Sequence, residues 1–322
     1  MPKKNKRIKK HYTILLPSVS AVVFLLLLFF IFWQGGAVPK HDIYVSSENP
    51  KQGETILIKI NGKYSGLSGY FDNEKLNFFR NGEYSDWSAL LGIDATHQPG
   101  KYKILVSVLG EKMEKKILVL SGDFSSVKMA ITKELKDKGY TGEKIISNIK
   151  NNDNPALNEV LAKFTPKANF NSPFSFPLEN MRKSGLDFGE FVSTGNNQIQ
   201  HFGVDLGAVT GTEVHAANDG KIVLAKNLSN YGKTIIIDHG LGIFSMYLHL
   251  DAFMASLNQD VKKAQVIGLS GNSGLSTAPH LHFSIRDNGT RIDPLLFIKT
   301  SEKTGENFNL ASIANSLLKI LK

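Results

Sequence analysis

Short apolar segments separated by turn signals fill the chain from Ile43 to Leu120. The run Thr55–Ile60 ends at an Asn-Gly pair, and a Pro-Gly pair comes shortly before the run Tyr102–Val108. Several short strands at this close spacing are typical of a small β-sandwich. We therefore predict an immunoglobulin-like β-sandwich over residues 41–121. No side chains there suggest chemistry, so we interpret it as a spacer or positioning module.

The next segment, residues 122–165, shows the three- and four-residue apolar spacing of amphipathic helices. A first helix is predicted to end near Gly139, and Thr141 is placed to cap a second. Asn154 followed by Pro155 is typical of an N-cap with proline at the first helical position, which predicts a third helix. The segment is therefore a predicted helical connector. The first helix is predicted from the spacing of Phe124, Val127, Ile131 and Leu135.

The chain returns to β character over residues 170–300, where strand-like runs alternate with Gly-rich turns. Beyond it, apolar residues recur at helical spacing between Leu310 and Leu321. This spacing predicts a short packing helix within residues 305–322. The predicted fold class is thus mainly β, with a helical connector between two β domains.

The N-terminus has a different pattern, because residues 12–33 form an apolar segment of about 22 residues without a charge. That length can span the hydrocarbon core of a bilayer, so we predict a transmembrane anchor. Basic residues in the tail 1–11 favour a cytoplasmic N-terminus, and Trp33 suits the far interface. The alternative is a cleaved signal peptide, with a Gly-Gly-Ala site at 35–37, although the apolar segment is longer than is usual for one. Both interpretations place the rest of the chain outside the cytoplasm.

The net charge of +9 is concentrated at the same end. Residues 1–40 carry seven Lys/Arg and no Asp/Glu, which leaves 31 basic against 29 acidic residues in the remainder. The basic balance therefore gives no argument for a nucleic-acid partner. The chain has no cysteine, so disulfides, thiolate metal sites and a cysteine nucleophile are excluded. Any metal must be held by His, Asp or Glu.

Six of the nine histidines lie between positions 201 and 282, and two of them suggest a metal site. In a strand, His280 and His282 point to the same face, while Leu281 and the following Phe283 point to the other. His201 and Asp205, four residues apart, supply further donors. A catalytic zinc takes three such ligands and leaves the fourth position to water. These spacings do not decide which of the paired histidines would be the ligand.

A third candidate is His249, which strand alternation places on the same face as Tyr247. The chain has no His-Glu-x-x-His helix, so the helical zinc-protease arrangement is excluded and a histidine would have to serve as the base. A Gly-rich turn at 268–274 is not followed by Gly-Lys-Ser/Thr, so it is not a phosphate-binding loop.

The run from His201 to Phe297 resembles the lysostaphin-type (LytM-like) zinc metallopeptidases that cleave peptidoglycan peptides. The resemblance covers about a third of the chain, and its motifs follow in the same order as in that family. The matching motifs are His201-Phe-Gly-Val-Asp205, Gly211-Thr212, Asn218-Asp-Gly220, Ile237-Asp-His-Gly240, Tyr247-Leu-His-Leu250, Ser276-Thr-Ala-Pro-His-Leu-His-Phe283 and Asp293-Pro294.

The resemblance implies an antiparallel β-sheet peptidase domain in which His201, Asp205 and His282 bind one zinc ion. It further implies that His249 and His280 are catalytic histidines that do not bind the metal. These would act on the water and on the developing oxyanion.

Tyr231 matches a tyrosine that borders the substrate groove in some members of the family. The implied function is a membrane-anchored zinc endopeptidase that hydrolyses peptidoglycan peptide bonds with zinc-activated water and histidine acid/base catalysis. Its expected location is the cell membrane, with the catalytic domain periplasmic or extracellular and a cell-wall regulatory protein as a further candidate partner. The alternative is a catalytically inactive relative that binds cell wall or activates a separate amidase. Such relatives typically lose ligands, whereas all five positions are intact here.

Overall fold

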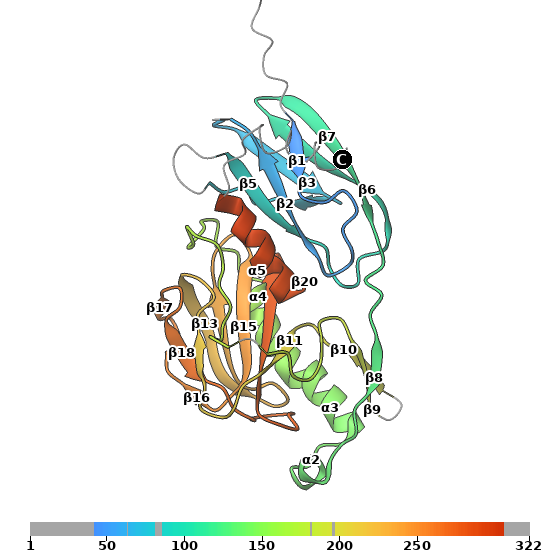
Figure 1. Cartoon of the computed structure of the whole chain (residues 1–322), viewed down its shortest axis with the longest axis vertical. Coiled ribbons are helices and arrows are strands. Elements are labelled where there is room, and N and C mark those ends of the chain that lie inside the picture. The colour runs from blue at the N-terminus through green and yellow to red at the C-terminus, as the bar shows by residue number, and fades with distance from the viewer. Residues whose placement is uncertain (1–41, 63, 81–85, 181, 195–196, 306–322) are drawn as a thin grey trace, which may run out of the picture. The chain divides into compact units, whose positions relative to one another are not determined.

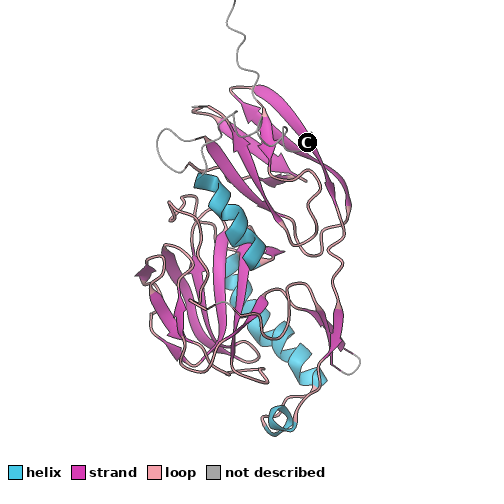
Figure 2. Ribbon diagram, in the orientation of Figure 1, coloured by secondary structure: helices cyan, strands magenta, loops and turns pink. Residues whose placement is uncertain are grey.

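The computed structural model describes residues 42–305 apart from 63, 81–85, 181 and 195–196, and these belong to one compact unit. Mostly antiparallel strands predominate in this part of the chain and helices are few, which confirms the mainly β fold class (Figure 2). The predicted tail 1–11, the anchor 12–33 and the helix beyond Gly305 lie outside the described residues. Among the residues that the structure describes, no helix is long and apolar enough to cross a membrane.

The upstream strands form two sheets that share one apolar core. Ile58 in the first sheet and Val106 in the second are both buried in this core. Ile58 lies opposite Ala89 in an antiparallel pair, and Val106 lies opposite Met113. Two sheets that pack face to face around one core are the arrangement of a β-sandwich. The first sheet has the order β1 (Ile43–Val45), β2 (Thr55–Ile60), β5 (Trp87–Gly92), and the second β4 (Glu74–Lys75), β3 (Leu67–Phe71), β6 (Gly100–Val108), β7 (Glu111–Val119).

The connector differs from the prediction in its first part. Residues Ser126–Lys128 form strand β8, which pairs in parallel with β9 (Phe191–Thr194), so the predicted helix through Val127 is wrong there. Only α2 (Lys133–Asp137) is helical, with Thr132 as its N-cap. A strand partner more than 60 residues away along the chain overrides the local helical spacing, as non-local pairing commonly does.

The second and third predicted helices are joined by a π-turn. α3 (Gly142–Asn148) begins at the predicted cap Thr141, and the π-helix Ile149–Asp153 connects it to α4 (Asn154–Leu161). Asn154 is therefore inside the helix and not its N-cap, and its N–H bonds to the carbonyl of Ile149, five residues back. The buried residues of this segment follow one another at steps of three, five, four and three. The step of five does not fit an α-helix, and it coincides with the π-helix. These buried residues are Ile145, Asn148, Asp153, Leu157 and Val160.

The downstream half contains a large antiparallel sheet (Figure 1). Apolar side chains form a core on each of its faces. Tyr247 and Phe283 pair across β15 and β19 and are fully buried in the larger core. Met246 and Leu248 point to the opposite face, where helix α4 covers them. The strand order is β11 (Val204–Gly207), β19 (His280–Asp287), β15 (Ile243–Leu250), β14 (Gly232–Asp238), β13 (Gly220–Leu228), β17 (Asp260–Val261), with β20 (Thr290–Ile292) on β19.

Four further strands and the end of the described chain complete this half. β12 (Glu213–His215), β18 (Val266–Leu269) and β16 (Ala252–Phe253) form a small sheet, and β10 (Asn197–Gln200) extends the pair β9–β8. Residues Pro294–Glu302 form helix α5, where β character was predicted. Asp293 caps α5 by accepting N–H bonds from Leu295 and Leu296, and proline begins the helix.

A buried carboxylate joins the two halves of the unit. Asp287 at the end of β19 is 4% exposed, and its Oδ2 accepts the N–H of Gly92 in β5 at 2.9 Å. Burial raises the pKa of Asp287 to about 7, against the lowering effect of the Gly92 hydrogen bond. Because no cation pairs with it among the described residues, ionisation of this group opposes folding.

We expect Asp287→Asn to remove a pH dependence of stability. A carboxyl whose folded pKa lies above its unfolded value of about 3.9 stabilises fully below that value, and this contribution is lost as the pH rises toward 7. The free energy of unfolding falls by on the order of 4 kcal/mol over this pH range for such a shift of the pKa. Asparagine keeps the acceptor for Gly92, so the variant should unfold at a higher denaturant concentration than the parent at pH 8 and at a similar one at pH 4.

Denaturant titrations at both pH values measure this effect. Asp260→Asn, which removes an exposed carboxylate, is the matched control. An unchanged difference between pH 4 and pH 8 in Asp287→Asn would contradict the prediction.

Candidate metal and catalytic site

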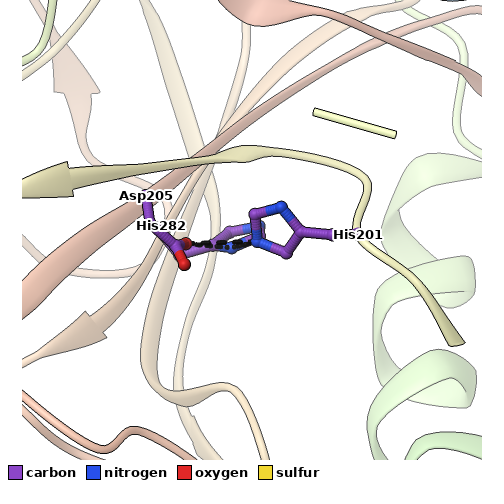
Figure 3. A group of neighbouring side chains, drawn as sticks. All are labelled: His201, Asp205 and His282. Carbon is purple, nitrogen blue, oxygen red and sulfur yellow. Dashed lines mark hydrogen bonds and ion pairs between the residues drawn. The ribbon is translucent and has the colours of Figure 1, made fainter. Parts of the chain in front are cut away.

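Three side chains from two distant parts of the chain converge on one point (Figure 3). His201 Nε2 lies 2.8 Å from His282 Nδ1 and 3.1 Å from Asp205 Oδ1, and the last two atoms are also 3.1 Å apart. Two nitrogens and one carboxylate oxygen at this spacing suit a small tetrahedral cation, with one position left open. These are the three ligands that the family resemblance implies.

Strand pairing and one glycine bring the three ligands together. Asp205 on β11 lies directly opposite His282 on β19, so both side chains leave the same face of the sheet. His201 precedes β11, and the chain between them passes close to the His282 ring at Gly203. A Cβ at Gly203 would lie 2.4 Å from His282 Nε2, so a side chain at this position would displace the ring.

The remaining polar atoms of the ligands are held by neighbours. His201 Nδ1 donates to the carbonyl of Asp187 at 2.9 Å, and Asp205 Oδ2 accepts the N–H of Leu186 at 3.1 Å. His282 Nε2 lies 2.8 Å from the hydroxyl of Ser284. Such contacts fix the ring orientation and direct the other nitrogen toward the metal position. Sequence reasoning did not identify these supporting groups, although Ser284 shares the strand face of His282.

The charge states suit metal binding. Burial lowers the pKa of His282 to about 4, so its imidazole is neutral at pH 7. Burial also disfavours charge on Asp205, but hydrogen bonds from His201 and His282 outweigh it and hold the pKa of this carboxyl well below its usual range. For His201, burial is outweighed by the hydrogen bond to Asp205, and its pKa is raised. Protons therefore compete with a cation mainly at His201.

Two further histidines lie beside the three ligands. The rings of His249 and His280 are 4.9 Å apart, and His280 Nε2 lies 3.5 Å from Asp205 Oδ1. His280 Nδ1 contacts the carbonyl of Ala278 at 2.8 Å, and His249 Nδ1 contacts the carbonyl of Ser273 at 2.8 Å. A neutral imidazole that donates from Nδ1 has an accepting lone pair at Nε2. Burial, followed by the neighbouring His280, lowers the pKa of His249 to about 3.

The expectation that His249 shares a face with Tyr247 is wrong. Tyr247 is fully buried in the larger core, where its hydroxyl accepts the N–H of Ala217 at 2.8 Å. His249 has a φ of 61°, so the strand twists sharply at this residue and its ring turns to the side of His282. A left-handed non-glycine residue beside a candidate site is the kind of backbone strain that functional sites retain.

The site lies in a cavity of about 1280 Å³ that the connector helps to line. Tyr231 is in its wall, and its hydroxyl donates to Asn154 Oδ1 of α4 at 3.2 Å. Burial raises the pKa of Tyr231 to about 12, so the phenol stays protonated. The structure thus places the predicted groove residue at the cavity, but it also shows a partner in the connector that the sequence did not indicate.

Buried polar contacts hold the connector to this wall. Asp153 is completely buried, and its two oxygens accept the N–H groups of Ser229 and Asn230 at 2.8 Å each. The side chain of Asn230 in turn bonds to Asn148 and to the carbonyl of Ile145. The connector therefore positions the loop that precedes Tyr231. It is a structural part of the cavity wall.

The fold and the site define a β protein in which two histidines and one aspartate could hold a metal ion, with two more histidines beside them. Residues 199–294 match Peptidase family M23, so this segment of the chain is similar to that family. This confirms the resemblance to the lysostaphin-type peptidases.

Known relatives match through the same region. Lysostaphin of Staphylococcus simulans is 39% identical over 129 residues, which cover 38% of this chain and 26% of lysostaphin. The murein hydrolase activator EnvC of Escherichia coli is 38% identical over 97 residues, which cover 30% of this chain and 23% of EnvC. The chain thus spans about a quarter of the length of these curated relatives.

A crystal structure from Pseudomonas aeruginosa, assigned to peptidase M23, matches over 78% of this chain and 96% of its own, with a TM-score of 0.58 and 24% identity. This likeness concerns the fold alone. Because it extends well beyond residues 199–294, the arrangement of upstream strands and peptidase-type sheet is shared with a solved protein.

Proposed function

We propose that the protein is a zinc metalloendopeptidase that hydrolyses peptide bonds in peptidoglycan. The observation that carries this proposal is the convergence of His201, Asp205 and His282, whose donor atoms lie within 3.1 Å of one another. His249 and His280 beside them complete the set of groups that hydrolysis requires. When bound, zinc would supply a Lewis acid for a water molecule and for the peptide carbonyl.

The residues of the chain supply the remaining steps. His249 and His280 each have Nδ1 held by a backbone carbonyl, which leaves Nε2 to exchange protons or hydrogen bonds with the reacting groups. One Nε2 can accept a proton from the attacking water and return it to the leaving amine nitrogen. The other, once it carries a proton on both ring nitrogens, can donate a hydrogen bond to the carbonyl oxygen as negative charge develops on it. The wall at Tyr231 would orient the substrate peptide.

We also propose that the catalytic domain lies outside the cytoplasm and that residues 12–33 attach the chain to the membrane. This proposal is supported by the charge-free apolar segment and the basic residues before it. Peptidoglycan lies outside the cytoplasmic membrane, so an exported catalytic domain is consistent with the proposed substrate.

A second candidate function is activation of a separate peptidoglycan amidase. It is favoured by the similarity to EnvC, a murein hydrolase activator. The intact set of three metal donors and two further histidines favours the enzyme, because an activator has no need of either group.

One experiment separates the two functions. The purified full chain is incubated with zinc and with purified peptidoglycan, zinc content is measured by elemental analysis, and released fragments are identified by mass spectrometry. About one zinc per chain and new peptide ends are expected, and His201→Ala should abolish both. A chain that releases no fragments alone but stimulates an added amidase would establish the activator and overturn the enzyme.

A further inference from the structure

The strand that carries His282 also presents an arginine to the same cavity. His282, Ser284 and Arg286 occupy alternate positions of β19, so they share one face of the sheet, and all three line the cavity. Four residues of extended chain separate Arg286 from His282, which is a span of about 13 Å. Arg286 is therefore within reach of a peptide that is bound with one of its bonds at the metal position.

Arg286 has no carboxylate partner among the described residues. Its Nη1 donates to the carbonyls of Phe202 and Ile285, each at 3.2 Å. These two neutral acceptors use only part of a guanidinium that carries five N–H donors.

Asp94, an acid that acts on Arg286, is hydrogen-bonded to a second arginine. Arg291 lies directly opposite Arg286 on β20, and its Nε and Nη2 bond to Asp94 at 3.0 and 2.8 Å. Like charges opposite each other on a sheet are destabilising. Burial, and then the neighbouring Arg291, lower the pKa of Arg286 to about 10, whereas Tyr231 and Asp94 act in the opposite direction. Within the described part of the chain, Arg286 is thus a partly buried cation with no carboxylate bonded to it, because the hydrogen bonds of Asp94 go to Arg291.

We propose that Arg286 is a substrate-binding residue that pairs with a free carboxylate of the bound peptide. Guanidinium and carboxylate form two parallel hydrogen bonds, and this pairing would supply the missing countercharge. The proposal rests on the proposed function and narrows its substrate class to peptides with a free carboxylate within about four extended residues of the cleaved bond. The carboxylate can be the C-terminus of the peptide or an acidic side chain.

The test compares synthetic stem peptides that differ in one group. One peptide has both carboxylates free, one has an amidated C-terminus, one has an amidated side chain, and one has both amidated. Binding to the zinc-loaded full chain is measured by calorimetry, and cleavage is followed to separate KM from kcat. A charged hydrogen-bonded pair contributes about 1.5–3 kcal/mol, so amidation of the recognised carboxylate should weaken binding by about 10–100-fold. The peptide that shows this loss identifies the source of the carboxylate.

The variants assign the effect to Arg286. Arg286→Gln should weaken binding of the free peptide by the same factor, change kcat little, and leave the doubly amidated peptide unaffected. Arg286→Lys should recover part of the affinity, because lysine restores the positive charge but cannot form the two parallel hydrogen bonds of a guanidinium. Arg182→Gln, which removes an exposed arginine, is the control. Zinc content and the unfolding temperature show whether each variant is folded.

The outcomes separate this inference from the proposed function. Binding that depends on the carboxylate and on Arg286, without cleavage of any peptide, would support the inference and contradict the enzyme. Cleavage of all four peptides with equal KM by the unmodified protein would overturn the role of Arg286 and leave the enzyme in place. This comparison needs no variant, so it stands even where Arg286→Gln fails to fold.

Discussion

His249→Ala is expected to keep zinc and to lose turnover by about 10²–10⁴-fold, the usual range for a positioned proton-transfer group. The ring of His249 lies 6.1 Å from that of His282, centroid to centroid, and does not contribute to the cluster of three donor atoms. Its loss should therefore leave the metal centre intact. Zinc content and the rate of fragment release from peptidoglycan measure the two effects separately.

The matched control for His249→Ala is His215→Ala. His215 belongs to the same half of the chain, but its Nε2 faces Glu213 at 3.8 Å and it does not line the cavity. This variant should retain both zinc and activity. A His249→Ala protein that cleaves peptidoglycan at the parent rate would contradict the catalytic role.

His282→Ala is expected to lose the metal. It removes one of three protein donors, whereas loss of a residue that only supports a ligand typically weakens metal binding by 10–100-fold. The affinity for zinc should therefore fall by more than about 100-fold, and activity should disappear with it. Titration with zinc against a chelating dye measures the affinity directly.

Ser284→Ala provides the graded comparison for this second prediction. Its hydroxyl lies 2.8 Å from His282 Nε2, so its removal frees the ring without deleting the donor. Zinc binding should weaken by about 10–100-fold and activity should return at high zinc concentration. Equal affinity in His282→Ala and the parent would exclude His282 as a ligand.

Strand alternation in the sequence predicted the directions of the candidate site histidines only where the strands are regular. Alternation correctly placed His280 and His282 on one face, because β19 is regular and Leu281 and Phe283 fill the core behind it. The same reasoning failed at His249, where a single residue with a φ of 61° interrupts the alternation. The side-chain sequence gives no local signal for such a backbone angle.

The parts that could not be predicted depend on contacts between distant segments. Val127 has helical spacing in the sequence, yet it pairs with Val192 in a parallel bridge between β8 and β9. Arg286 has no bonded carboxylate among the described residues, and this likewise depends on Asp94, almost 200 residues upstream, which bonds to Arg291. Local patterns cannot show which of two arginines a distant carboxylate will bind.

The π-turn between α3 and α4 makes the length of the connector a fixed quantity. Most connecting segments tolerate the gain or loss of a residue, but each residue of a helix advances its face by about 100°. Deleting one residue within 149–153 would restore regular α-helical bonding and rotate α4 relative to α3. Asp153 could then no longer face the loop that precedes Tyr231 while the apolar side chains of α4 face the sheet. The number of residues in this helical segment is therefore fixed by two sets of contacts, those of Asp153 with the loop before Tyr231 and those of α4 with the sheet.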